Sequence, residues 1–206
     1  MSVKSLFIAT AIFSASLIGT TSVAHAAPLT QYASSVIDFS SQWGSSNWSA
    51  AQVLGAPNTF GYGDIPTAWA PSSMNGTLEY ITVGFDTLVH ASGATIRETS
   101  GNGFVYQIDA VDSFGNLHTV WNGVDTSAPG SPVDFTQLWD LTSYLVKGLK
   151  IYANTSHSGT WEEIDSIQLI GSTSAAIPEP STVALLGLGL LGFAASRRKS
   201  KTDGKA

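Results

Sequence analysis

The residues best suited to chemistry in this sequence are three acidic side chains close together, Glu162, Glu163 and Asp165, with His157 just upstream. Paired carboxylates perform glycoside hydrolysis, so a polysaccharide-modifying hydrolase using Glu162 or Glu163 is one interpretation. In a strand, Glu163 and Asp165 would share a face and Glu162 would point away. We favour a solvated strand end or a structural Ca²⁺ ligand over catalysis.

Other catalytic patterns are missing from the sequence. The chain has no cysteine, which excludes cysteine nucleophiles, thiolate zinc sites and disulfides. Three histidines, His90, His118 and His157, lack the H-x-x-x-H spacing of a metal site. The G-x-S-x-G turn of a serine hydrolase does not occur. Apart from the Ca²⁺ alternative, we therefore assign no catalytic residue, no metal ligand and no cofactor.

Tryptophan is the second residue type that suggests a function, because its flat ring stacks on sugar rings. The chain has six tryptophans. We expect Trp69 and Trp121 to lie in the core, where a large apolar ring is best buried. Trp43, Trp139 and Trp161 lie in loop-like surroundings. They are the candidate ligand contacts, with packing as the alternative.

The charge of the central part of the chain excludes some partners. Between the two chain ends there are only three basic residues, Arg97, Lys147 and Lys150, against thirteen acidic ones, a net charge of −10. Such a surface repels nucleic acid and anionic lipid. It attracts cations, including Ca²⁺.

Short alternating segments bounded by Gly, Pro, Asn, Asp and Ser predict an all-β domain at residues 27–171. In one of them, Ile81, Val83 and Phe85 fall on a single face. The number and order of the segments favour a β-sandwich, with a jelly roll as the preferred form. The expected strands are 80–85, 94–98, 104–111, 117–121, 146–152 and 165–170.

Two connections between these strands have recognisable signals. Residues 112–116 combine Asp, Ser, Gly and Asn and predict a hairpin turn. Pro129 and Pro132, with neighbouring Gly and Ser, predict a long loop before residue 146. Residues 172–177 are expected to be a flexible linker.

One short helix is predicted at residues 49–54. Asn47 or Ser46 would cap its first turn, since short polar side chains accept hydrogen bonds from free backbone amides. The following Gly-Ala-Pro, residues 55–57, would end it.

The first 26 residues predict a secretory signal peptide. Lys4 supplies the positive start, residues 6–18 are mostly apolar, and Ala24 and Ala26 form an A-x-A cleavage site. The mature chain is expected to begin near Ala27, and the alternative is a retained N-terminal anchor.

The C-terminal region predicts a short transmembrane helix with a basic stop. Residues 182–196 carry no charge, and Arg197 and Arg198 follow them. As a helix this stretch would be about 22 Å long. A bilayer core is about 30 Å thick, so a permanent anchor is not favoured. Residues 200–206 would form a cytoplasmic tail by the positive-inside rule.

Pro178, Glu179 and Pro180 precede this apolar stretch. Together with the basic stop, they make residues 178–199 resemble the PEP-CTERM sorting signal of Gram-negative bacteria. The alternative is an ordinary anchor that happens to contain Pro-Glu-Pro. The resemblance implies recognition by an exosortase, a membrane cysteine protease or transpeptidase. It also implies an association with exopolysaccharide or biofilm production.

The central domain resembles a known fold as well. Residues 48–57, 64–69 and 79–85 are similar to the opening of galactose-binding-like jelly rolls. Residues 96–99 and 161–165 resemble the scarf module of pappalysin-type secreted proteins. Members of this superfamily bind sugars, lipid head groups or proteins through loops at one end.

These observations predict an exported, exosortase-processed protein of the cell surface or extracellular matrix that is not an enzyme. It would be held transiently in the inner membrane and then reside at the cell surface, in the outer membrane or in the matrix. Exopolysaccharide is the candidate ligand. The alternatives are a structural module that binds other matrix proteins, or a polysaccharide hydrolase.

Overall fold

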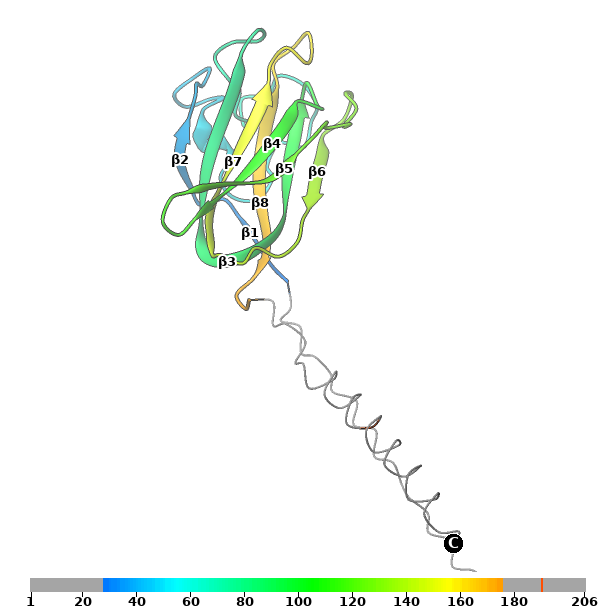
Figure 1. Ribbon diagram of the computed structural model, residues 1–206. Helices are drawn as coiled ribbons and strands as arrows, with labels where there is room; N and C mark the ends of the chain where they lie inside the picture. Colours follow the sequence, from blue (N-terminus) through cyan, green and yellow to red (C-terminus); the bar gives the residue numbers. More distant parts are fainter. Residues whose placement is uncertain (1–27, 176–189, 191–206) are drawn as a thin grey trace, which may run out of the picture.

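Two antiparallel β-sheets form a sandwich in the computed structural model, which describes residues 28–175 and Leu190 (Figure 1). The predicted signal peptide, its cleavage site and the tail lie outside the described residues, and so do the sorting signal and the membrane helix apart from Leu190. No helix in the described part is long and apolar enough to cross a membrane.

The strands fall into two groups that share β3. One sheet, called sheet A here, has the order β1-β8-β3-β6, and the other, sheet B, has the order β2-β3-β7-β4-β5. This arrangement confirms the predicted all-β sandwich. The elements are β1 (Leu29–Tyr32), β2 (Ser35–Phe39), the 3₁₀ helix η1 (Ala50–Val53), β3 (Leu78–Ser100), β4 (Val105–Asp112), β5 (Leu117–Asn122), β6 (Val133–Leu138), β7 (Val146–Asn154) and β8 (Glu163–Ser172).

The continuous strand β3 corrects the prediction of separate strands at 80–85 and 94–98. Its first half pairs in sheet B and its second half in sheet A, with register shifts around the bend between them. No proline interrupts this stretch, and the turn-like Asp86 and Thr87 are simply exposed at the bend. Gly93 permits the close packing there, since a Cβ would lie 2.6 Å from the Leu138 side chain.

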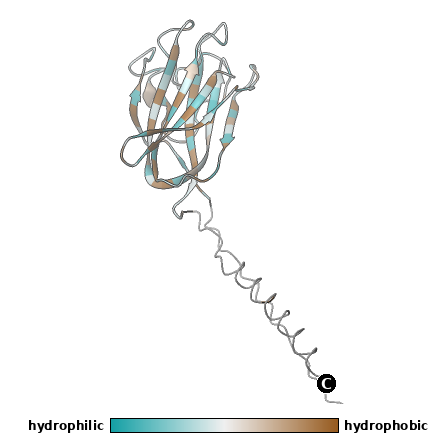
Figure 2. Cartoon of the chain, in the orientation of Figure 1, coloured by the Kyte–Doolittle hydropathy of each residue, from teal (hydrophilic) through white to brown (hydrophobic). Residues whose placement is uncertain are grey.

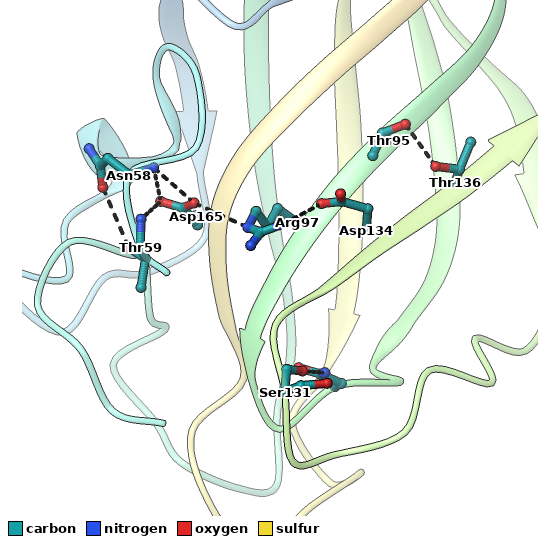
Figure 3. A network of polar contacts seen from close by, with 9 residues as sticks. Asn58, Thr59, Thr95, Arg97, Ser131, Asp134, Thr136 and Asp165 are labelled. Carbon is teal, nitrogen blue, oxygen red and sulfur yellow. Dashed lines mark hydrogen bonds and ion pairs between the residues drawn. The ribbon is translucent and has the colours of Figure 1, made fainter. Parts of the chain in front are cut away.

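Three edge strands, β1, β2 and β6, were not predicted. β6 lies where a long loop was expected, and Phe135 is its one buried residue. It is held to β3 by the Thr95–Thr136 hydroxyl pair at 2.8 Å and the Arg97–Asp134 ion pair at 2.9 Å (Figure 3). An edge strand buries few side chains, so its hydrophobic alternation is weak.

The core lies between the two sheets, and apolar and polar residues alternate along the strands that enclose it (Figure 2). Trp69 is fully buried and donates its indole N–H to the Ser41 carbonyl at 3.1 Å. Trp121 packs against the core edge to face with Phe135, with ring centres 5.3 Å apart. The prediction for Trp69 is confirmed, whereas Trp121 is only partly buried and packs at the edge of the core.

The local turn signals had mixed outcomes. The 112–116 hairpin turn is confirmed, with the Asp112 carboxylate accepting the Phe114 and Asn116 amides at 2.9 Å each. The helix is shorter than predicted, and Ser49 takes the position before it in place of Asn47 or Ser46. Its hydroxyl donates to the Ser46 carbonyl at 2.8 Å and caps no helix amide.

Candidate functional site

An aromatic pocket of about 200 Å³ opens at one end of the sandwich. The loops after β2 and β7 lie at this end, and the bend of β3 lies at the other (Figure 1). The pocket is lined by Trp43, Trp48, Asp64, Ala70 and Trp161. Ligand sites commonly occupy such loop ends, where a rigid sandwich positions variable loops.

Trp48 takes an unusual backbone conformation to reach the pocket. Its φ of 52° is the one positive φ among the non-glycine residues described. This left-handed conformation costs a bulky side chain about 1–2 kcal/mol. Backbone hydrogen bonds to Pro66 at 3.1 Å and from Ala70 at 3.3 Å hold it. The Trp48 ring meets that of Trp43 edge to face, with centres 4.9 Å apart and planes at 66°.

A buried carboxyl group stands behind the pocket. Glu163 is 0 % exposed, and burial is the main cause that raises its pKa to about 8. The Ile65 amide, 3.2 Å away, lowers the pKa, and the charge of the nearby Asp64 raises it. Glu163 is therefore largely neutral at pH 7, and Asp64 is the acidic residue that lines the pocket.

The acidic cluster is buried, so its interpretation as a solvated strand end is wrong. Asp165 is 1 % exposed and accepts the Asn58 and Thr59 amides at 3.1 Å each (Figure 3). Arg97 lies 3.7 Å from the same carboxylate and bridges it to Asp134. The cluster is buried because the 58–65 loop, about 100 residues earlier in the chain, folds over the start of β8.

The orientation predicted within this cluster is confirmed. Glu163 and Asp165 both contact the 58–65 loop, whereas Glu162 accepts the Ser158 hydroxyl at 2.8 Å. Burial raises the pKa of Glu162 to about 7, against the lowering effect of Ser158. The three carboxyl groups thus hold surface loops onto the sandwich.

This arrangement does not support the hydrolase or the Ca²⁺ interpretation. His157 lies 2.8 Å from the Asn102 carbonyl and has no contact with the acids. Within residues 28–175, no three acidic or histidine side chains gather in a way that could hold a metal ion. Glu162 and Glu163, the residues that the hydrolase interpretation rests on, are both buried and neither lines the pocket.

The three candidate tryptophans separate into two places. Trp43, which is 55 % exposed, and Trp161 line the pocket together with Trp48. Trp139 lies instead near the bend of β3, where its indole N–H donates to the Ala91 carbonyl at 3.2 Å. Trp48 was missed as a site residue because its ring position depends on a left-handed backbone that the sequence does not signal.

Trp139→Ala therefore serves as a test of this division. We expect it to lower the free energy of unfolding by about 3 kcal/mol, because a ring packed on the core is lost. Urea titration would measure this loss. Ligand affinity at the pocket should stay the same in the folded variant, and a fall in affinity would contradict the separation of Trp139 from the site.

Two family profiles match the chain. The Pappalysin-1, SD scarf domain, C-terminal, matches residues 21–179, which includes the whole sandwich. The PEP-CTERM protein-sorting motif matches residues 176–199 and includes the Pro-Glu-Pro sequence. A search of curated proteins found no match.

Solved structures share the fold at low sequence identity. A protein fragment from Bacteroides thetaiotaomicron has a TM-score of 0.54 at 11% identity, covering 69% of this chain and 91% of that one. Reduced XRCC1 bound to the DNA polymerase β catalytic domain has a TM-score of 0.51 at 14% identity, and the match covers 68% of this chain and 98% of that one. A family 32 carbohydrate-binding module from Clostridium perfringens, in complex with GalNAc-β-1,3-galactose, has a TM-score of 0.50 at 14% identity. This match covers 69% of this chain and 95% of that one.

Proposed function

This chain belongs to the family of the pappalysin-1 SD scarf domain, C-terminal, and we propose that it is a carbohydrate-binding protein without enzyme activity. The PEP-CTERM motif that follows the domain implies export and exosortase-mediated anchoring at the cell surface. We further propose that its ligand is exopolysaccharide of the surrounding biofilm matrix.

The observation that supports carbohydrate binding is the pocket of Trp43, Trp48 and Trp161. Indole rings combine a large apolar face with an N–H donor, which suits the mixed apolar and hydroxyl surface of a sugar. The pocket is smaller than the roughly 300–1,000 Å³ of sites for drug-sized molecules. We therefore propose that it takes one sugar unit of a longer chain.

The fold by itself does not indicate whether the ligand is a carbohydrate or a protein. Among structures of this fold, one is in complex with a disaccharide and another is bound to a protein domain. A structural module that binds matrix proteins is thus the second candidate. Protein-binding surfaces are broad, whereas this pocket is small and concave, and that difference favours the sugar.

Trp43→Ala tests the proposal directly. We expect it to weaken binding to the host's own exopolysaccharide about 5- to 150-fold in a pull-down or on a glycan array, if stacking on a sugar ring contributes the roughly 1–3 kcal/mol that stacking on a nucleic-acid base does. The matched control is Phe114→Ala, which removes another exposed aromatic ring in the β4–β5 turn at the far end. Equal binding by both variants would remove the pocket from the proposal.

A further inference from the structure

The pocket combines aromatic walls with negative charge. The faces of indole rings carry partial negative charge and attract cations, with tryptophan the strongest of the aromatic residues. Three indoles and the Asp64 carboxylate line the pocket, and Ala70 completes it. Groups of aromatic rings bind ammonium ligands in proteins, and a nearby carboxylate adds electrostatic attraction for the same positive charge.

Glu163 adds a second potential charge behind this lining. It is 0 % exposed, its Oε2 atom accepts the Ile65 amide at 3.2 Å, and its Oε1 atom has no hydrogen-bond partner. A buried carboxyl oxygen without a partner is costly. Glu163 is close enough to Asp64, which lines the pocket, for the charge of Asp64 to raise its pKa. A cation bound beside Asp64 would offset that charge and favour the ionised form of Glu163.

No basic side chain lines the pocket to oppose a cation or to bind an acidic sugar. Arg97 is engaged by Asp134 and Asp165. Lys150 lies over the Tyr80 ring, 3.5 Å from its centre, on sheet B. A uronic acid would therefore bring its negative charge next to Asp64 without a compensating partner, which costs affinity.

On these grounds we propose that the pocket selects an amino sugar with a free, protonated amine, such as an unacetylated hexosamine unit. This inference rests on the proposed carbohydrate binding and narrows it to a cationic ligand. The amine would lie between the indole rings and Asp64, and the sugar ring would stack on Trp43 or Trp161.

Calorimetric titration of the full chain in detergent, with glucosamine tetramer and N-acetylglucosamine tetramer at pH 6, tests the inference. We expect the amine form to bind about tenfold more tightly, and this preference to shrink at high salt. Asp64→Asn should abolish the preference. Asp86→Asn, which makes the same charge change at the exposed bend of β3, should retain it.

The possible outcomes separate the proposed amine selectivity from the proposed carbohydrate binding on which it rests. Equal or tighter binding of the acetylated tetramer, lost in Trp43→Ala, would overturn the amine selectivity and leave carbohydrate binding intact. Competition by choline as strong as by glucosamine would overturn the amino sugar in favour of a general ammonium site. No binding of either tetramer, together with no binding to exopolysaccharide, would overturn both proposals.

Discussion

The protein is expected to lose stability between pH 5 and pH 9, and replacing Glu98 with glutamine is expected to make this loss much smaller. Glu98 is 0 % exposed near the end of β3. Burial is the main cause that raises its pKa to about 9, and the neighbouring Asp125 raises it further through a hydrogen bond and its charge. The Gly103 amide, at 2.9 Å, acts in the opposite direction.

The sign follows from comparing the folded and unfolded chains. The unfolded Glu98 releases its proton near pH 4.5, whereas the folded one keeps it until about pH 9. Stability from this group is thus complete below pH 4.5 and is lost as the pH rises to 9, by up to about 1.4 kcal/mol per pH unit. The raised pKa values of Glu162 and Glu163 act in the same direction.

Asp112 has the opposite pH dependence to Glu98, because its pKa is lowered in the folded protein. Hydrogen bonds from His118 and Asn116 lower the pKa of Asp112 below its ordinary 3.8. Stability from Asp112 is therefore present above pH 3.8 and is lost as the pH falls below it. Glu98, Glu162 and Glu163 thus favour the folded state at low pH, whereas Asp112 favours it above pH 3.8.

Urea unfolding at pH 5, 7 and 9 would measure this effect. In Glu98→Gln, the free energy of unfolding should fall less between pH 5 and 9 than in the parent protein. Asp140→Asn removes an exposed carboxylate and should leave the slope unchanged. Identical slopes in the parent and Glu98→Gln proteins would contradict the assignment of this buried proton to Glu98.

Replacing Pro178, Glu179 and Pro180 with alanines is expected to stop processing altogether. The sorting motif at residues 176–199 includes this sequence, and the motif implies processing by an exosortase. The precursor should then accumulate in the inner membrane, where membrane fractionation and intact-mass measurement would detect the uncleaved chain.

A matched control for this change lies just upstream. Alanine at Thr173 and Ser174 alters two residues of the expected linker, beyond Ser172 at the end of β8, and leaves the motif intact. That variant should be processed normally. Mature protein at normal levels outside the cell, despite the loss of Pro-Glu-Pro, would show that the motif is not the processing signal.

The sequence predicted those parts of the fold that depend on neighbouring residues. The 112–116 turn follows from the short polar side chains of Asp112 and Asn116. The sandwich follows from alternation in the well-buried strands. The edge strand β6 was not predicted because Phe135 is its only buried residue, so its sequence shows little alternation. Its conformation depends on tertiary pairing with β3.

The candidate site was predicted in part for a similar reason. Trp43 and Trp161 were found by residue type and by their loop-like surroundings. Trp48 joins them through a left-handed backbone that distant hydrogen bonds impose. The burial of Asp165 depends on amides 106 and 107 positions earlier in the chain, a pairing that no local pattern signals.

The position of β8 has a mechanical consequence. β8 begins just after Trp161 at the pocket end and finishes at Ser172, next to the sorting motif at the opposite end. A pull between a bound polysaccharide and a surface tether would therefore run along this strand. Its hydrogen bonds to β1 and β3 lie across that direction, so they must yield together and not one by one. If the pocket binds a polysaccharide as proposed, this pairing would load the domain in shear, and single-molecule pulling between these two points should record high rupture forces.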